Sequence, residues 1–283
     1  MQRIKFVCVS NKGGVGKTSV STQILVPYLF SKGNKPIDFI TIDDVNSTAD
    51  TLEDTKIMNI HELASDDRES LVEFLNSAES CVFDIGGNKT ANDIINEIGE
   101  SEIVDDVWWV IPLGDGDEDV LNAIDTYQII ALNDASPKVM FALTKVMSHS
   151  EESYTKQFLY VFGHKYNKVK RTLWGAIGSH PYLIMPGIDN FNIGKSLKRT
   201  MYELGSDDYI NSLREEKVVN AEAEKKHFAE KEEYDEGLKH ESNRIGYNIS
   251  TANKFKKYSE LHLMAAFQKI DETLKMSGKK SKK

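Results

Sequence analysis

Two lysines, three glycines and a threonine lie close together near the N-terminus, in a pattern suited to holding phosphate. An apolar run precedes them and a helix-like stretch follows them. The segment between reads Ser10-Asn11-Lys12-Gly13-Gly14-Val15-Gly16-Lys17-Thr18-Ser19. Glycines let a backbone turn so that its N–H groups surround phosphate oxygens, and a helix N-terminus adds partial positive charge. We therefore predict a phosphate-binding loop in which Lys17 reaches the β- and γ-phosphates and the Thr18 hydroxyl ligates Mg²⁺.

The loop departs from the common pattern G-x-x-x-x-G-K-[ST] at its first position, where Asn11 stands, and it carries an additional lysine at position 12. In this form it matches the deviant Walker A motif. Over residues 1–205 the chain resembles the ParA/MinD family of ATPases, which includes partition proteins and positioning ATPases. The resemblance implies that residues 11–19 bind ATP. It also implies a nucleotide-sandwich homodimer, in which Lys12 reaches the partner's phosphates, and a protein partner that stimulates hydrolysis.

Acidic residues follow two further apolar runs. Asp84 ends the run Cys81-Val82-Phe83, and an aspartate at the carboxyl end of a neighbouring strand is placed to hold Mg²⁺. Its alternative role is to cap a turn or helix. Asp43 and Asp44 end another run, where the ParA/MinD resemblance implies Asp-x-Asp with the second aspartate positioning the attacking water. Val45 occupies that second position, so either Asp44 takes its place or the chain hydrolyses ATP slowly.

The segment Thr144-Lys145-Val146-Met147 bears on the choice of base. P-loop GTPases end the corresponding strand with [NT]-K-x-D, whose aspartate accepts hydrogen bonds from guanine. A methionine cannot accept two strong hydrogen bonds, so ATP is favoured over GTP. The resemblance further places Thr144 and the loop Pro186-Gly187-Ile188 beside the adenine; the alternative is that they are ordinary strand ends.

Apolar runs and helix-like stretches alternate along residues 1–205. The runs that we expect to be strands cover residues 4–10, 37–43, 80–85, 107–112, 138–144 and 182–185. Several are continuously apolar, as in strands buried on both faces of a parallel sheet. The expected helices cover residues 18–32, 68–78, 91–100, 118–132, 151–163 and 194–204. This alternation predicts an α/β fold, a doubly wound and mostly parallel sheet with helices on both faces.

Composition excludes several other classes of protein. The chain has 283 residues, 40% of them hydrophobic and 28% charged, which is the balance of a globular protein. Two cysteines, Cys8 and Cys81, cannot make a disulfide scaffold or a four-cysteine zinc site, and we expect both to be core residues, as we do Trp108 and Trp109. No run approaches the length of a membrane span, so we expect a cytoplasmic protein.

After residue 205 the composition changes, and we predict a separate helical extension over residues 206–283. Apolar residues recur at three- and four-residue steps from Phe255 to Leu274, including Tyr258, Leu261 and Met264. The net charge of the chain is −9, but residues 254–283 carry nine lysines against three acids, a net +6. This basic helix could dock on the protein body, grip DNA phosphates through Lys254, Lys256 and Lys257, or lie on an anionic membrane. We rank DNA above membrane, because this segment has no tryptophan.

These features favour an ATP-dependent dimerisation switch that acts in DNA or plasmid partition or in cargo positioning and hydrolyses ATP to ADP and phosphate. One alternative is a P-loop ligase or synthetase on the same fold, which needs a further substrate pocket. Another is a nucleotide-binding adaptor with little turnover, which Val45 keeps open. Iron–sulfur reductases are disfavoured because Cys8 and Cys81 lie inside apolar runs.

Overall fold

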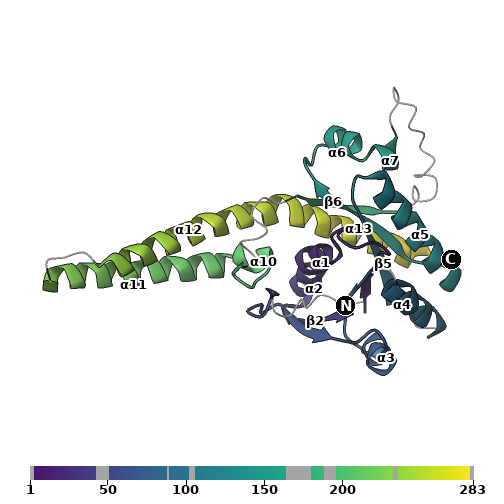
Figure 1. Ribbon diagram of the computed structural model, residues 1–283, viewed down its shortest axis with the longest axis horizontal. Helices are drawn as coiled ribbons and strands as arrows, with labels where there is room; N and C mark the ends of the chain where they lie inside the picture. The colour runs from purple at the N-terminus through teal and green to yellow at the C-terminus, as the bar shows by residue number, and fades with distance from the viewer. Residues whose placement is uncertain are drawn as a thin grey trace.

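A seven-stranded parallel sheet forms the centre of the computed structural model (Figure 1). The structure describes residues 3–42, 51–87, 89–101, 106–163, 180–187, 196–231 and 235–280. Within these residues the strand order is β3-β2-β4-β1-β5-β6-β7. The strands are β1 (Lys5–Cys8), β2 (Ile37–Ile42), β3 (Met58–Glu62), β4 (Cys81–Ile85), β5 (Val107–Leu113), β6 (Val139–Val146) and β7 (Tyr182–Pro186). The predicted α/β fold is confirmed, and each strand pair in the sheet is parallel.

The edge strand β3 is absent from the sequence-based prediction. It pairs on one side with β2, and three of its side chains are polar, namely Asn59, His61 and Glu62. A strand at the edge of a sheet is not buried on both faces, so it lacks the continuous apolar run by which the other strands were predicted. The other six strands lie within about two residues of their predicted ends.

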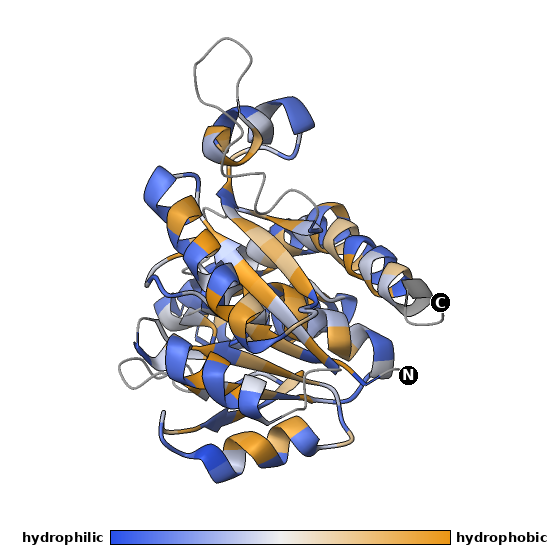
Figure 2. Cartoon of the chain, turned by 90° about the vertical axis from the view of Figure 1, so that its right-hand side faces the viewer, coloured by the Kyte–Doolittle hydropathy of each residue, from blue (hydrophilic) through white to orange (hydrophobic). Residues whose placement is uncertain are grey.

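Helices cover both faces of the sheet (Figure 1). On one face lie α1 (Lys17–Val20), η1 (Ser21–Leu25), α2 (Val26–Gly33), α10 (Met201–Leu204), η4 (Ser259–Leu263) and α13 (Met264–Lys280). On the other lie α3 (Arg68–Asn76), α4 (Lys89–Glu100), α5 (Asp117–Asn133), α6 (Glu151–Gln157) and α7 (Leu159–Phe162). Figure 2 shows the hydrophobic strands between helices whose outer faces are hydrophilic.

The sheet has a hydrophobic core on each face, and alternate side chains along each strand point into one core or the other. Phe6 and Cys8 of β1 point into the core beside α2, whereas Val7 points into the core beside α4. Trp108 and Trp109 divide between the two cores in the same way, which confirms both as core residues. Both cysteines are buried and free, as predicted. Burial raises the pKa of the Cys81 thiol to about 12.

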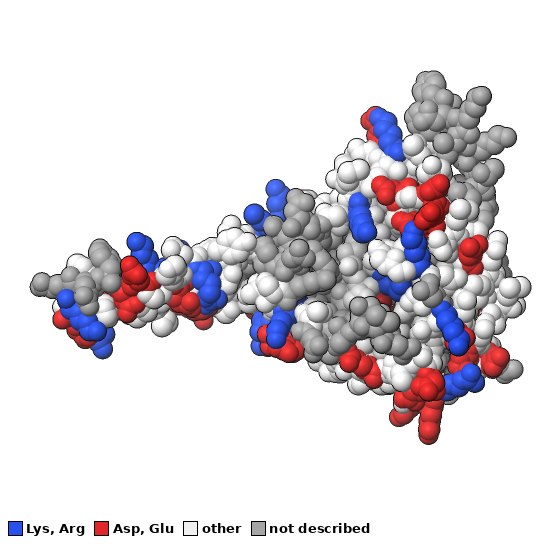
Figure 3. Space-filling view, viewed as in Figure 1, with Lys and Arg blue, Asp and Glu red and all other residues white. Residues whose placement is uncertain are grey.

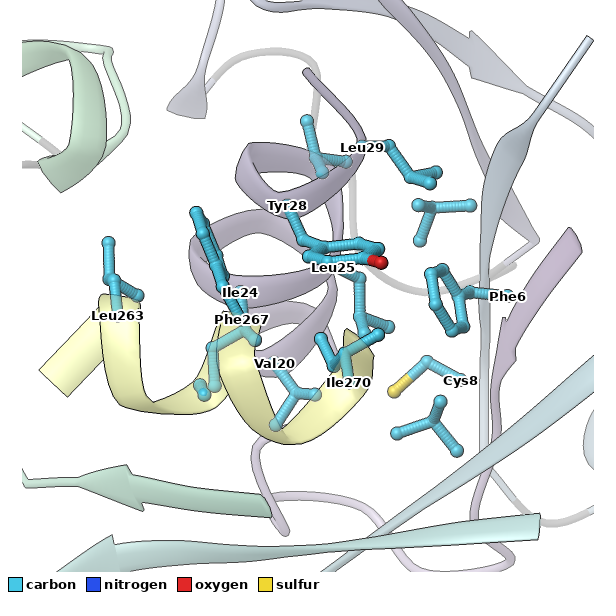
Figure 4. Close-up of a cluster of buried hydrophobic side chains, with 14 of the residues drawn as sticks. Phe6, Cys8, Val20, Ile24, Leu25, Tyr28, Leu29, Leu263, Phe267 and Ile270 are labelled. Atoms are coloured by element: carbon cyan, nitrogen blue, oxygen red, sulfur yellow. The ribbon is translucent and has the colours of Figure 1, made fainter. Parts of the chain in front are cut away.

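The C-terminal helix α13 packs on the same core as α1 and α2. Figure 4 shows Phe267 and Ile270 from this helix lying against Tyr28 of α2, with Phe6 of the central strand beyond. The rings of Tyr28 and Phe267 meet edge to face at 5.6 Å, and Asp271 accepts a 2.7 Å hydrogen bond from the Tyr28 hydroxyl. The final amphipathic helix therefore docks on the protein body. The domain boundary near residue 205 stays a prediction.

A π-helical turn, η4, shifts the buried face of this C-terminal helix. Leu261 and Met264, predicted to lie on the apolar face, are 57% and 47% exposed, whereas Leu263 is buried. The prediction assumed an unbroken α-helical period, but a π turn holds about one more residue and rotates everything after it. No helix in the described part of the chain has the length and apolarity to cross a membrane.

Two long antiparallel helices, α11 (Asp207–Lys231) and α12 (Glu236–Tyr258), project from the body and are called the arm below (Figure 1). Near the body their contact is apolar, with Ile210 and Leu213 packed against Ala252. Farther out it is polar: the Asn220 amide donates to the Ser242 hydroxyl at 2.8 Å and to the Leu238 carbonyl at 3.0 Å. Because α12, η4 and α13 are continuous, the arm is rooted in the body core.

Candidate functional site

The glycine-rich loop lies between the central strand β1 and the helix that begins at Lys17. Gly14 and Gly16 have φ angles of 75° and 94°, a left-handed region that glycine adopts without strain. A Cβ atom at Gly16 would lie 3.1 Å from the Thr144 methyl carbon, so the position is also too close for a side chain. At Gly13 and Gly14 nothing lies within 4 Å of a Cβ atom built there. The loop is thus a cradle with its glycine side clear, which fits a phosphate chain.

The first-turn threonine of the following helix contacts the strand-end aspartate. Asp84 is 4% exposed, and its carboxylate accepts hydrogen bonds from the Thr18 hydroxyl at 2.6 Å and from the Ser21 hydroxyl at 3.0 Å. The two residues that the sequence predicts as Mg²⁺ ligands are therefore adjacent in space. A hydroxyl and a carboxylate are hard oxygen donors of the kind that Mg²⁺ prefers, so this donor set fits the ion.

Lys17 folds back over the loop, and its ammonium donates to the Lys12 carbonyl at 3.1 Å. Gly87, just after β4, lies over the same place: a Cβ atom there would be 3.4 Å from the Gly13 nitrogen and 3.7 Å from the Lys17 ammonium. The segment that follows Asp84 therefore touches the loop.

Lys12 is held by two acids at the start of α5. Its ammonium lies 2.7 Å from Asp119 Oδ1 and 3.4 Å from Glu118 Oε2. The hydrogen bond with Asp119 raises the pKa of Lys12. The helix predicted over residues 118–132 has these two acids in its first turn, where they do lie, but the sequence did not predict their ion pair with Lys12. The strand order explains the ion pair: β5 pairs with β1 in parallel, so the segment after β5, which carries the two acids, lies beside the loop after β1, which carries Lys12.

Thr144 and Lys145, at the end of β6, both contact the loop. The Thr144 hydroxyl is 2.9 Å from the Val15 carbonyl oxygen and 3.1 Å from that of Leu113, and this side chain is 2% exposed. The Lys145 ammonium donates to the Gly14 carbonyl at 3.2 Å. Thr144 thus supports the loop from beneath; the adenine contact predicted for it stays a prediction.

The end of β7 meets the same segment. The Gly187 N–H donates to the Val146 carbonyl at 2.9 Å, and Pro186 is the last residue of β7. The predicted base-flanking segments, residues 144–147 and 186–187, are therefore neighbours, while Ile188 lies outside the described residues. Met147, which stands where GTPases carry aspartate, is 82% exposed.

Other predicted site residues divide between described and undescribed parts of the chain. Asp43, Asp44 and Val45 lie outside the described residues. Asn11 is half-buried, and its side-chain oxygen is buried without a hydrogen-bond partner in the described structure. Ser19 is half-buried in the first turn after the loop.

The three lysines predicted to contact DNA lie on the solvent side of α12. Lys254 and Lys257 are exposed, but Lys256 is 2.6 Å from Asp207, and this hydrogen bond raises the pKa of Lys256. The neighbouring Phe255 and Tyr258 are buried in the body core. Figure 3 shows lysine and arginine interleaved with acidic side chains along the visible face of the arm. DNA binding by these lysines stays a prediction.

The fold and the site together define the class of protein. A parallel α/β sheet carries a glycine-rich loop directly after its central strand, and the loop is followed by a helix with Lys17 and Thr18 at its start. This arrangement is the P-loop nucleotide-binding fold. No protein-family model matches the sequence, and no curated protein matches it.

Solved structures with a similar fold include the cell division protein MinD of Aquifex aeolicus, at 12% identity, over 70% of this chain and 88% of that one, with a TM-score of 0.46. An ATP complex of a McdA variant from Cyanothece is 13% identical over 74% and 92%, with a TM-score of 0.42. A plasmid partition protein of Borrelia burgdorferi is 13% identical over 69% and 96%, with a TM-score of 0.39.

Proposed function

We propose that this chain binds ATP with Mg²⁺ at residues 11–19 and acts as an ATP-dependent dimerisation switch of the ParA/MinD kind, in DNA partition or cargo positioning. One observation carries the proposal. The Thr18 hydroxyl and the buried Asp84 carboxylate, 2.6 Å apart, stand at the end of an open glycine cradle beside Lys17. A buried carboxylate, a hydroxyl and an ammonium at one end of such a cradle suit a metal-bound triphosphate.

Three side chains beside the cradle, those of Lys17, Thr18 and Asp84, would hold the nucleotide and its metal ion. Lys17 would leave the Lys12 carbonyl and pair with the β- and γ-phosphates, because a charged partner gives the stronger hydrogen bond. Thr18 and Asp84 would hold Mg²⁺, Asp84 directly or through water. When bound, Mg²⁺ supplies positive charge that offsets the charge of the phosphate oxygens. Gly87 lies beside the Lys17 ammonium, so a movement of Lys17 towards the γ-phosphate would shift Gly87 and, through it, the start of α4.

Lys12 would supply the switch itself. In the single chain its ammonium is paired with Asp119 and Glu118, so it is not available to a second nucleotide. In a sandwich dimer it would exchange these carboxylates for the partner's phosphates. Lys12 keeps an ion pair before and after this exchange, so the exchange itself gains little free energy. Dimerisation would therefore depend on whether the partner holds a triphosphate for Lys12 to bind.

The ligase and the adaptor remain the competing functions. A ligase of this fold has no use for Lys12 in a second active site. An adaptor would bind ATP without turning it over, whereas in an ATPase Asp43 and Asp44 would position the attacking water. ATP turnover measured with and without duplex DNA distinguishes the three functions: the switch should hydrolyse ATP slowly alone and faster with its partner, the adaptor should not hydrolyse it, and the ligase should not respond to DNA.

Calorimetric titration of ATP with Mg²⁺ tests the nucleotide site. We expect the parent chain to bind and Lys17→Ala to lose binding, because the cation that faces the phosphates is gone. Lys35→Ala is the matched control, since Lys35 is an exposed lysine that pairs with Glu79 away from the loop. An ATP affinity of Lys17→Ala equal to that of the parent chain would contradict the proposal.

A further inference from the structure

The amide of Gln157, the last residue of α6, binds one of the two segments that flank the expected base site, residues 144–147, and ties it to Asp115. Its Oε1 accepts from the Met147 N–H at 2.9 Å. Its Nε2 donates to the Lys145 carbonyl at 3.1 Å and to the Asp115 carboxylate at 3.0 Å. Two acceptors face the nitrogen and one donor faces the oxygen, so the three partners allow a single orientation of the amide.

The segment that Gln157 holds is bulged. Leu143 of β6 pairs with Ile184, but Val146 pairs with Pro186, so β6 carries one additional residue between these pairs. Within the bulge Lys145 has a φ of 57°, a left-handed conformation that is strained for a residue with a side chain. Bulges of this kind re-aim side chains beside active sites. Here the bulge sends the Lys145 ammonium to the Gly14 carbonyl of the phosphate loop.

Gln157 determines which backbone groups of the segment remain free. The Met147 N–H already donates its one hydrogen to Gln157 Oε1, so it cannot donate a hydrogen bond to a base. The Lys145 carbonyl accepts from Gln157 but keeps a second lone pair, and the Val146 carbonyl, which accepts from Gly187, keeps one as well. The segment therefore offers acceptors and withholds a donor. Adenine presents a 6-amino donor, whereas guanine presents a 6-oxo acceptor at the same position.

We propose that Gln157 is a positioning residue for the purine base: by holding residues 145–147 it keeps Lys145 on the phosphate loop and makes the segment favour a 6-amino over a 6-oxo purine. The inference rests on the proposed nucleotide binding and adds the residue that sets its choice of base. Met147, 82% exposed at the end of the segment, is free to cover the face of that base.

Two variants of the full chain separate base choice from general support. Gln157→Leu keeps the size of the side chain and removes all three hydrogen bonds, so it frees the Met147 N–H for a 6-oxo group. Gln157→Glu keeps an acceptor oxygen for that N–H but cannot donate to Lys145 or Asp115. Lys156→Ala is the control: it removes the preceding side chain of α6, which pairs with Glu152 in the same helix.

Dissociation constants for ATP and GTP, each with Mg²⁺, are measured by calorimetry for the four proteins. The parent and Lys156→Ala are expected to share one GTP-to-ATP ratio of dissociation constants. In Gln157→Leu the ATP affinity falls and the ratio drops by roughly tenfold, the effect of about one hydrogen bond. Gln157→Glu loses ATP affinity but keeps the parent's ratio.

A ratio unchanged in Gln157→Leu, or an equal fall in both affinities, would overturn the inference while leaving nucleotide binding intact. A parent chain that binds neither nucleotide would overturn the proposed function, and this inference with it. Circular dichroism at the titration temperature checks that each variant is folded. Should Gln157→Leu fail to fold, Gln157→Glu decides, because a change in its ratio contradicts the role given to the Met147 N–H.

Discussion

The phosphate loop and the arm hold their backbones in opposite ways. In the loop, short-range contacts converge from the ends of two strands: Gly87 after β4, and Thr144 and Lys145 of β6, each meet a different part of residues 12–16. In the arm, two helices touch mainly each other, and the outer part of their contact is a polar network around Asn220. A change in the loop is therefore felt across the sheet, whereas a change in the arm stays local. Substitutions in the two regions can test this difference.

The largest effect is expected at the root of the arm, where α13 joins the body. Phe267 is 5% exposed and packs edge to face on Tyr28. Phe267→Ala should lower the free energy of unfolding by about 3–5 kcal/mol, because it removes buried apolar surface and leaves a cavity. Urea unfolding measures the change. Met276→Ala, on the same helix at 68% exposure, should be close to neutral. A small loss for both would mean that α13 is not part of the core.

The next effect is expected in the loop. Gly16→Ala forces a side chain into a left-handed conformation 3.1 Å from the Thr144 methyl carbon. We expect a loss of roughly 1–3 kcal/mol in stability and of most of the ATP affinity, because the cradle must shift. Unfolding and calorimetry on the same samples measure both. If ATP affinity survived intact, the cradle would not depend on this glycine.

The pH dependence of stability reports a contact between the segment after β6 and η4, the turn that joins the arm to α13. His149, in the segment after β6, stacks on His262 of η4 with ring centroids 3.7 Å apart. Burial, with a smaller contribution from His262, lowers the pKa of His149 to about 4. Below pH 6.5 His149 binds a proton in the unfolded chain but stays neutral in the folded chain until about pH 4. The contribution of His149 to the free energy of unfolding is therefore complete above pH 6.5 and decreases as the pH falls towards 4.

The variant His149→Phe keeps a ring and cannot titrate. Its loss of stability between pH 7 and pH 5 should be smaller than the parent's by about 1 kcal/mol, a value reduced for partial exposure of the ring. Urea unfolding at the two pH values makes the comparison. Identical losses in both proteins would show that His149 contributes nothing to this dependence.

The smallest effect has the opposite sign and lies in the arm. Gly246 is inside α12, and nothing lies within 4 Å of a Cβ atom built there. Gly246→Ala should stabilise the protein by about 0.5–1 kcal/mol, because it removes backbone freedom from the unfolded chain. ATP affinity should not change. Destabilisation here would indicate that the arm packs more closely at this position than the structure shows.

Sequence alone predicted the features that depend on local pattern. Continuous apolar runs located six strands, and the glycine–lysine motif located the loop between β1 and its helix. It missed β3, because an edge strand has no such run, and it misplaced Leu261 and Met264, because the π turn at η4 breaks the helical period. It also missed the partners of Lys12 and the hydrogen bond of Gln157 with Asp115. Each of these contacts joins the segment after one strand to the end of a helix that lies far from it in the sequence, and only the strand order brings the two together.

Light scattering with and without ATP and Mg²⁺ tests the dimerisation switch most directly. The parent chain, 31.9 kDa, should double in mass with ATP and remain single with ADP. Lys12→Ala should stay single with either nucleotide while still binding ATP, because it lacks the lysine that we propose reaches the partner's phosphates. Arg68→Ala, which removes an exposed cation paired with Glu97, should dimerise like the parent. A parent chain whose mass is the same with and without ATP would contradict the switch.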